Sequence, residues 1–484
     1  MKYNTLSIEQ LHELLKNGKT TPSEIAKQLL FLCEQEKHSN AINFLNKEVL
    51  KEAELLELKQ ADNSLLFGIP YAAKDNISTK GIPTCASSNI LKGYIPSFDA
   101  TIISKLKDNQ TLMLCKTALD ELGMGGVGLY SSNGEIYNPY DSKRIVGGSS
   151  SGSAYLVAKG IVPFAIGTDT GDSIRKPASL NNIVGFKPSY GAISRYGLLP
   201  YSPSLDTIGF FTRNVNDIAI LCDATFGYDK RDATSIVINE SDFYKNINSI
   251  KKTKKYCYIK YVIEALPNEL KEKYYSFFNQ LKKQGYEVME VDFPKELLLA
   301  VSPVYMMISY SESASTNANL DGIKFGARVD GDDYEAVIKN TRNAGFGEEV
   351  KKRFLIGSLN LNKDKQLLYL NQAKKVRRLI VEQMSKIFQQ ADILIVPPFY
   401  DIAPLVSDIK KPLTEEQEII TDILILANMN GSPSITIPFT KKAGMGIGIN
   451  FITKPKSDLL CLQAAKVAEN IIGIKNQIVG ENYE

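Results

Sequence analysis

The stretch "GIVPFAIGTDTGDSIRKPAS" (residues 160–179) joins an apolar run directly to a dense polar segment. The apolar part, residues 161–169, predicts a buried strand, and the turn after it carries Thr170, Gly171, Asp172 and Ser173. In open α/β sheets, ligands bind at the carboxyl ends of the strands. The stretch therefore predicts a site at the end of a buried strand, with hydroxyl groups in it.

Strands alternate with helices on both sides of this stretch. Strands are predicted for residues 65–75, 111–117, 254–260, 286–293, 392–398, 434–439 and 446–454, and helices for residues 101–110, 153–160 and about 267–284. This alternation predicts an α/β fold with a sheet covered by helices on both faces. Residues 1 to about 60 predict helices, with capping boxes that begin at Ser7 and Thr21. No linker divides the chain, so we expect one domain over 1–484, with a helical part (1–60) and an α/β core (61–484).

Composition excludes several classes of protein. The chain has 484 residues, of which 44% are hydrophobic and 23% charged, as in globular proteins. The 57 basic residues nearly balance the 54 acidic ones, which argues against a dedicated nucleic-acid binder. There is no secretory signal and no apolar run of membrane-spanning length, and the six scattered cysteines suggest neither a disulfide framework nor a metal site. We expect a cytoplasmic protein without a membrane association.

Histidine is nearly absent from the sequence. The two histidines, His12 and His38, both lie in the helical N-terminal part and predict ordinary helix residues. A serine nucleophile elsewhere in the chain would therefore need another base. The same scarcity excludes a zinc site built on histidine, and we expect no metal.

The loop "RIVGGSSSGSA" (residues 144–154) admits three interpretations. A phosphate-binding loop would need Lys and Ser or Thr where Ser153 and Ala154 stand. A nucleophile elbow would make Ser150 the nucleophile, but it requires a downstream histidine. The third interpretation is a polar loop before a helix. Since a small-residue helix follows at once, the loop can present backbone N–H groups to an anion or a developing oxyanion.

A lysine can replace histidine as the base if burial makes it neutral. Lys74 ends the apolar strand "FGIPYAAK" (residues 67–74), whereas most other lysines lie in polar surroundings. Taken alone, Lys74 would be interpreted as a capping or ion-paired lysine. Together with the two serine-rich loops, it becomes a candidate base.

Three segments together resemble the amidase signature family: "GGSSSGSA" (residues 147–154), "GTDTGDSIRKPAS" (167–179) and "AAKDN" (72–76). The resemblance implies a large mixed β-sheet flanked by helices on both faces. It also implies a triad in which Ser173 is the nucleophile, Ser149 the relay serine after a cis peptide bond, and Lys74 the base. The implied oxyanion hole consists of the backbone N–H groups of Thr170, Gly171, Asp172 and Ser173.

Further segments are similar to the glutamine-hydrolysing subunits of tRNA-dependent amidotransferases within that family. These segments span residues 82–109, 119–125, 137–150, 194–217, 229–235, 320–326 and 346–358. The resemblance implies that Arg353 binds the carboxylate of glutamine, that Asp422 binds its α-amino group, and that Tyr305 lines the pocket. It implies no cofactor in this chain. A partner B subunit would use ATP and Mg²⁺ to amidate Glu-tRNA(Gln), or Asp-tRNA(Asn), and a small C subunit would hold the two together.

The sequence departs from the usual family pattern at Asp172, Lys176 and Ser151, where the family has glycine, glutamine and glycine. A carboxylate that points into an oxyanion hole would repel the developing charge. We expect Asp172 to point outward and to pair with Lys176 or Arg175. Two alternatives to a glutaminase subunit stay open: a stand-alone amidase for small or fatty amides, and an inactive scaffold with the same fold.

Overall fold

The strands of the computed structural model, which describes residues 1–58 and 64–480, form one mixed sheet. Across the sheet the order of the 11 strands is β1-β3-β2-β4-β6-β5-β10-β11-β9-β7-β8. The strands are β1 (Ile42–Leu45), β2 (Pro70–Lys74), β3 (Leu112–Thr117), β4 (Phe164–Asp169), β5 (Val184–Lys187), β6 (Thr207–Thr212), β7 (Lys255–Ile259), β8 (Glu287–Val291), β9 (Ile393–Val396), β10 (Ser434–Lys442) and β11 (Met445–Thr453).

Parallel pairing brings two chemically important strand ends together. Strand β2 lies between β3 and β4 and is parallel to both, with Tyr71 opposite Phe164 and Ala73 opposite Ile166 on β4. The carboxyl ends of β2 and β4 therefore meet at one edge of the sheet. Strands β7, β8 and β9 are also parallel, whereas the central strands β6, β5, β10 and β11 pair antiparallel with their neighbours.

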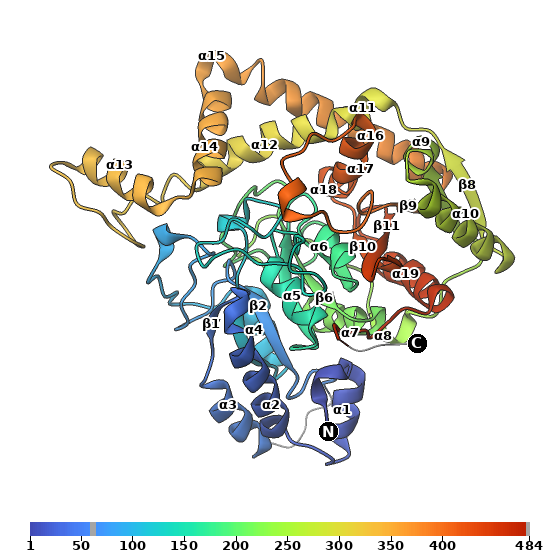
Figure 1. Ribbon diagram of the computed structural model, residues 1–484, viewed down its shortest axis with the longest axis horizontal. Coiled ribbons are helices and arrows are strands. Elements are labelled where there is room, and N and C mark those ends of the chain that lie inside the picture. Colours follow the sequence, from blue (N-terminus) through green and yellow to red (C-terminus); the bar gives the residue numbers. More distant parts are fainter. Residues whose placement is uncertain (59–63, 481–484) are drawn as a thin grey trace.

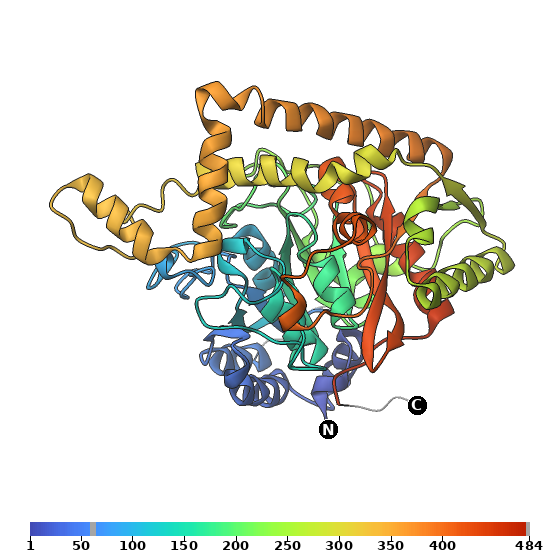
Figure 2. The same cartoon turned by 45° about the horizontal axis from the view of Figure 1, so that its top comes forward.

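Helices cover the sheet and extend beyond it (Figure 1). Helices α1–α3 lie at the end of the molecule where the N-terminus is found. Helices α12 and α16 run side by side across the opposite end, as Figure 2 shows. The helices up to α10 are α1 (Ile8–Lys16), α2 (Pro22–Gln35), α3 (Val49–Glu57), α4 (Thr101–Asp108), α5 (Ser151–Ala158), α6 (Arg175–Leu180), α7 (Val215–Thr225), α8 (Phe243–Asn246), α9 (Lys260–Glu264) and α10 (Asn268–Lys283).

The remaining helices follow β8 and include the part that projects furthest from the sheet. Helix α13 forms an arm at the left of Figure 1. These helices are α11 (Lys295–Leu299), α12 (Val301–Thr316), α13 (Tyr334–Gly345), α14 (Glu348–Leu361), α15 (Lys363–Gln366), α16 (Leu370–Gln390), α17 (Glu415–Asp422), α18 (Ile425–Asn430) and α19 (Asp458–Ile472). Short 3-10 helices span Tyr3–Thr5, Glu36–Ser39, Asn89–Leu91, Glu121–Gly123 and Val406–Asp408.

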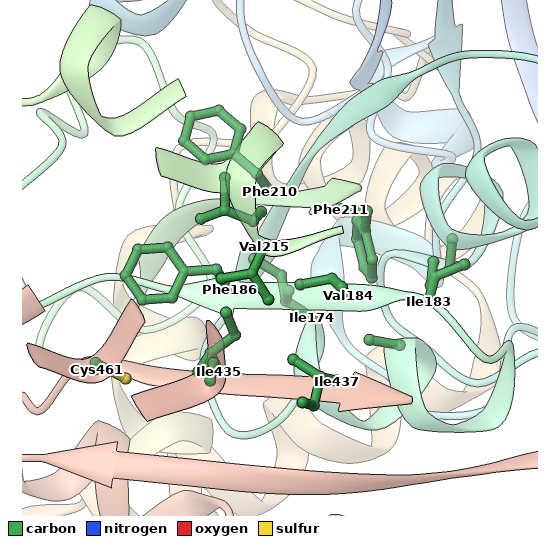
Figure 3. Packing of buried hydrophobic residues seen from close by; sticks show 14 of the residues in the cluster. Ile174, Ile183, Val184, Phe186, Phe210, Phe211, Val215, Ile435, Ile437 and Cys461 are labelled. Carbon is green, nitrogen blue, oxygen red and sulfur yellow. The ribbon is translucent and has the colours of Figure 1, made fainter. Parts of the chain in front are cut away.

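The core lies between the sheet and the helices packed on it (Figure 3). Phe186 of β5, Phe210 of β6 and Ile435 of β10 are fully buried there. Alternation of such side chains fixes the register of the central strands, because a slip by one residue would turn each of them to the opposite face. The core thereby holds the strand ends that carry the polar site in fixed positions.

The structure confirms the predicted α/β class, the mixed sheet and the strands and helices named from the sequence. The capping box of Ser7 with Gln10 is present, and the Thr21 side chain accepts from the Glu24 backbone N–H. Two differences stand out. The first 60 residues also contribute a strand, β1, which pairs antiparallel with β3. Strands β5 and β6, which are short and lie in the centre of the sheet, were not predicted.

Candidate active site

Lys74 lies at the carboxyl end of β2, fully buried. Its Nζ donates to Ser149 Oγ at 2.9 Å, to Ser150 Oγ at 2.9 Å and to Thr168 Oγ1 at 2.8 Å. Thr168 belongs to the neighbouring strand β4, so the parallel pairing of β2 with β4 brings the lysine to its partners. Three hydroxyl groups thus fix the position of a lysine that has no carboxylate in contact with it among the described residues.

Burial lowers the pKa of Lys74 to about 7, although the more distant Asp120, Asp169 and Asp206 carboxylates act to raise it. The physical cause is the cost of removing the ammonium ion from water, which favours the neutral amine. A neutral amine at neutral pH can accept a proton, which an ordinary surface lysine cannot do. The lowered pKa therefore favours the form of the side chain that can act as a base.

Ser149 lies in the loop before α5, and the Gly148–Ser149 peptide bond is cis. The Asp120 carboxylate organises this region by accepting from the backbone N–H groups of Val127, Gly128 and Tyr130 at 3.1–3.2 Å. A side chain at position 148 would collide with Asp120, since an added Cβ there would lie 2.1 Å from Oδ2. Glycine at 148 is therefore what allows the loop to pack on this carboxylate.

Ser150 is not available as a nucleophile. Its side chain is fully buried, accepts from Lys74 Nζ and from the Thr168 backbone N–H, and donates to the Thr168 carbonyl at 3.0 Å. The nucleophile-elbow interpretation of the Gly/Ser loop is thus not supported. Ser150 instead connects the loop to β4 and to Lys74.

Residues 170–173 connect β4 with α6 and face the Gly/Ser loop. The backbone N–H of Ser150 donates to the Ser173 carbonyl at 3.3 Å. Within residues 1–58 and 64–480, the backbone N–H groups of 170–173 donate to no acceptor and the Ser173 hydroxyl has no hydrogen-bond partner. The segment therefore offers a free hydroxyl beside a row of free donors, the arrangement that an attacking oxygen and a developing oxyanion need.

Two buried groups hold this segment from opposite sides. Thr170 Oγ1 donates to Asp206 Oδ1 at 2.6 Å, and Asp206 also accepts from the backbone of Tyr201 and Ser202. On the other side, Arg175 Nη2 donates to the Gly171 carbonyl at 2.7 Å. The segment is therefore fixed by a carboxylate and a guanidinium group, neither of which is exposed.

Arg175 pairs with Asp169 rather than with Asp172. Its Nε and Nη2 donate to the two oxygens of Asp169 at 3.0 and 2.9 Å, and both side chains are fully buried. Burial alone would raise the pKa of Asp169, but the guanidinium charge lowers it to about 2. Arg175 also donates to the Leu424 carbonyl and to Asn428 of α18, and so ties the end of β4 to the segment around α17 and α18.

The Asp172 carboxylate pairs with Lys176 Nζ, as expected from the sequence. It does not point into solvent, because its side chain is only 12% exposed and that of Lys176 10%. Burial raises the pKa of Asp172, and the Lys176 charge opposes this. No hydrogen bond joins this carboxylate to the Ser173 hydroxyl in the described part of the chain.

Arg353 and Tyr305 lie on the two helices next to this segment. The Tyr305 ring of α12 faces Gly171 so closely that an added Cβ there would lie 3.1 Å from the ring. Arg353 of α14 is 8% exposed, donates to the Tyr201 hydroxyl at 3.1 Å, and lies over the Tyr310 ring. Glu349 accepts from Nε and Nη2 of Arg353. A cavity of about 490 Å³ adjoins this pair and is lined by Glu121, Tyr130, Ser131, Gly347, Glu349 and Lys352.

Asp422 ends α17 on the far side of the same region. Its carboxylate raises the pKa values of Lys176 and of Tyr310, after larger contributions from burial and nearer charges, so it lies near both. It makes no hydrogen bond or ion pair with any residue that the structure describes. The Asp422 carboxylate is thus near Tyr310, whose ring lies against the Arg353 guanidinium group.

The residues named from the sequence therefore gather around one region, but the positioning residues Thr168, Asp206, Tyr201 and Asn428 were missed. Only Asp206 left a signal in the sequence, since it is the last residue of the turn "YSPSLD" (residues 201–206), directly before the strand at 207. No group of three or more metal-ligating side chains occurs among the described residues. Nor do those residues include a helix long and apolar enough to cross a membrane.

A buried lysine held by two loop serines and by a threonine on the neighbouring strand, together with a free serine hydroxyl and free N–H donors, defines a serine hydrolase of the amide-cleaving type. The chain belongs to the amidase family, whose model matches residues 29–462.

Two relatives and one solved structure show which members of the family this chain resembles. The chain is 40% identical to the A subunit of the glutamyl-tRNA(Gln) amidotransferase of Mycoplasma pneumoniae over 90% of this chain and 92% of the relative. It is 38% identical to that of Mycoplasma genitalium, over 93% and 95%. The crystal structure of the corresponding Thermotoga maritima protein has a TM-score of 0.79 at 31% identity and covers 97% of this chain and 96% of that one.

Proposed function

We propose that the protein is the glutaminase subunit of a tRNA-dependent amidotransferase, and that it hydrolyses glutamine to supply ammonia. The observation that carries the proposal is the fully buried Lys74, whose Nζ contacts Ser149 Oγ in the same loop whose Ser150 backbone N–H donates to the carbonyl of Ser173. The similarity to the A subunit of glutamyl-tRNA(Gln) amidotransferase over 90% of the chain supports the choice of substrate and complex.

In the proposed reaction the neutral Lys74 amine takes the proton of Ser149, which takes the proton of Ser173. The Ser173 oxygen then attacks the side-chain amide carbon of glutamine, and the N–H groups of Thr170, Gly171, Asp172 and Ser173 stabilise the oxyanion. Ammonia leaves after it receives a proton along the same chain of groups, and an acyl-enzyme remains. Water then cleaves the ester and releases glutamate.

The substrate is held as a zwitterion in this proposal. The Arg353 guanidinium binds the α-carboxylate, for which a planar fork of donors is well suited. The Asp422 carboxylate binds the α-ammonium group, and Tyr305 packs between them. A stand-alone amidase for fatty amides has no need of an opposed guanidinium and carboxylate, and the Arg353 and Asp422 pair therefore favours an amino-acid substrate.

The larger assembly is also part of the proposal. A B subunit would bind ATP and Mg²⁺ and use the ammonia to amidate Glu-tRNA(Gln) or Asp-tRNA(Asn), while a C subunit holds the heterotrimer together. The chain itself would need no cofactor. A near-neutral charge of +3 fits a subunit that leaves most tRNA contacts to its partner. We propose a cytoplasmic location because charged tRNA is made and used there.

The proposal is tested by ammonia release from glutamine, with and without the partner subunits. We expect glutaminase activity in the complex, and its loss in the Ser173→Ala variant with the fold intact by circular dichroism. The acyl-enzyme should be trapped on Ser173 and identified by mass spectrometry of a quenched reaction. Activity that survives in Ser173→Ala would contradict the proposed nucleophile, and a complex that hydrolyses no glutamine would favour the inactive scaffold.

A further inference from the structure

The Asp172–Lys176 ion pair lies inside the proposed site, not on the surface. The two side chains are 12% and 10% exposed, and the Lys176 backbone N–H donates to the Asp172 carbonyl at 2.9 Å. Neither residue has a role in the proposed reaction beyond the backbone N–H of Asp172. A buried ion pair contributes little net stability, because the cost of desolvation offsets the electrostatic attraction. Stability therefore does not explain why the pair lies in the site.

The position of the pair relative to Asp422 suggests that reason. Arg175, next to Lys176, donates to the carbonyl of Leu424, which is two residues beyond Asp422, at 2.7 Å. The start of α6, which carries Lys176, is therefore tied to the segment that directly follows Asp422, the residue that the proposed function assigns to the α-ammonium group. Burial acts to lower the pKa of Lys176, but the nearby Asp172 and then Asp422 carboxylates raise it above its usual value. Lys176 has two carboxylates near it and pairs with only one of them.

We propose that Asp172 is a positioning residue that holds Lys176 Nζ and so keeps the Asp422 carboxylate free for the α-ammonium group of the substrate. This inference rests on the proposed function, since it assumes an amino-acid amide as substrate. Without the Asp172 charge, Lys176 would turn to Asp422 and neutralise it. In a site shielded from water the competition between two cations for one carboxylate is strong, because charges attract more strongly at low dielectric.

The first variant is Asp172→Asn, which keeps the shape of the side chain and removes its charge. We expect KM for glutamine to rise at least about tenfold, as loss of one charge-assisted hydrogen bond would cause, with kcat changed less than about threefold. Glutaramate, which is glutamine without the α-amino group, should keep its KM. The double variant Asp172→Asn/Lys176→Gln should restore KM for glutamine to within about threefold, because no competing cation remains.

A matched control uses another ion pair of the same spacing. Arg378 and Glu382 pair at positions i and i+4 on α16, with side chains 73% and 48% exposed. Glu382→Gln should leave both substrates unaffected. If Asp172→Asn does not fold, Lys176→Gln alone tests the inference, since KM for glutamine should then stay within about threefold of the wild type.

The inference is overturned if Asp172→Asn raises KM equally for glutamine and glutaramate, if the double variant is not restored, or if Lys176→Gln alone raises KM for glutamine tenfold. A failure of the proposed function is seen separately, as a wild-type complex that hydrolyses no glutamine. In that case a crystal structure of Asp172→Asn decides: Lys176 Nζ hydrogen-bonded to Asp422 supports the inference, and Lys176 retained at residue 172 overturns it.

Discussion

At the scale of single residues, the site depends on one lysine whose proton affinity is changed by its surroundings. Burial moves the pKa of Lys74 from 10.5 to about 7, while Ser149, Ser150 and Thr168 supply hydrogen bonds without a neutralising charge. An ion pair in the same place would have held the lysine protonated. The absence of a contacting carboxylate among the described residues is therefore as important as the burial.

The pH dependence of glutamine hydrolysis follows from this pKa. Because only the neutral amine accepts a proton, kcat/KM should fall about tenfold for each pH unit below about 7 and level off above it. Lys74→Arg should be inactive across the whole range, because arginine stays protonated. The measurement is a pH profile of ammonia release in the complex. A profile that is flat from pH 5 to about 8 would contradict a neutral lysine base.

Recognition of the substrate is tested at Arg353. Arg353→Ala should lower kcat/KM for glutamine about ten- to a hundredfold, because it removes a charge-assisted hydrogen bond of roughly 1.5–3 kcal/mol. Hydrolysis of 4-aminobutanamide, which lacks the α-carboxylate, should change much less. The comparison uses steady-state kinetics on both amides. Equal losses would mean that Arg353 supports the fold through Tyr201 and Glu349 rather than binding the substrate.

At the scale of elements, Arg175 connects parts that are distant in the chain. It reaches from the start of α6 to Asp169 on β4, to the Gly171 carbonyl, and to Leu424 and Asn428 at α18. The free N–H groups of residues 170–173 depend on this connection for their direction. Asp206, directly before β6, also fixes the position of residues 170–173, because it accepts a hydrogen bond from the hydroxyl of Thr170.

Loss of the Arg175 connection should be severe. Arg175→Met leaves the buried Asp169 carboxylate without its cation, so the free energy of unfolding should drop by about 3–5 kcal/mol. Urea denaturation followed by circular dichroism measures this change. The double variant Arg175→Met/Asp169→Asn should recover part of the stability, because it removes the uncompensated charge. No recovery would show that the bonds to Leu424 and Asn428 matter more than the ion pair.

The sequence predicts the strand ends and the reactive residues better than it predicts the buried residues that hold them in position. Lys74, Ser149 and Ser173 stand in motifs with defined spacing, and the apolar runs before them predict β2 and β4. Asp206 and Asn428 act on this site from 36 and 259 residues away, through Thr170 and Asp169. Such contacts are set by the strand order β4-β6-β5-β10, which no local pattern specifies. The partner of Asp172 was predictable because Lys176 is four residues away, whereas its burial was not.

At the scale of the whole molecule, the proposed catalytic and recognition groups come from different halves of the chain. Lys74, Ser149 and Ser173 lie on or beside β2, α5 and β4, whereas Arg353 and Asp422 lie on α14 and α17 (Figure 1). Bound glutamine would contact both halves at once. Binding should therefore stabilise the protein as a unit.

This expectation can be measured without turnover in the Ser173→Ala variant. Glutamine at a hundred times its Kd should raise the free energy of unfolding by about 2.7 kcal/mol, seen as an increase in Tm. The same addition to Ser173→Ala/Arg353→Ala, whose affinity should be about ten- to a hundredfold lower, should raise it by only about 0.4–1.4 kcal/mol. Glutamate, with the same α-carboxylate and α-ammonium groups, serves as a second ligand. A Tm that does not respond to glutamine in Ser173→Ala would contradict the proposed contact across the two halves.

The parallel pairing of β2 with β4 has a consequence for how new enzymes could arise from this scaffold. Because Lys74 at the end of β2 is held by Thr168 on β4 and by the loop before α5, side chains on α12, α14 and α17 can be changed without altering these contacts, whereas α18 must keep Asn428, which binds Arg175. Natural or engineered substitutions on these helices can thus change which amides are accepted, while the proposed triad of Lys74, Ser149 and Ser173 stays in place. Libraries confined to α12, α14 and α17 should accordingly yield altered selectivity far more often than inactive protein.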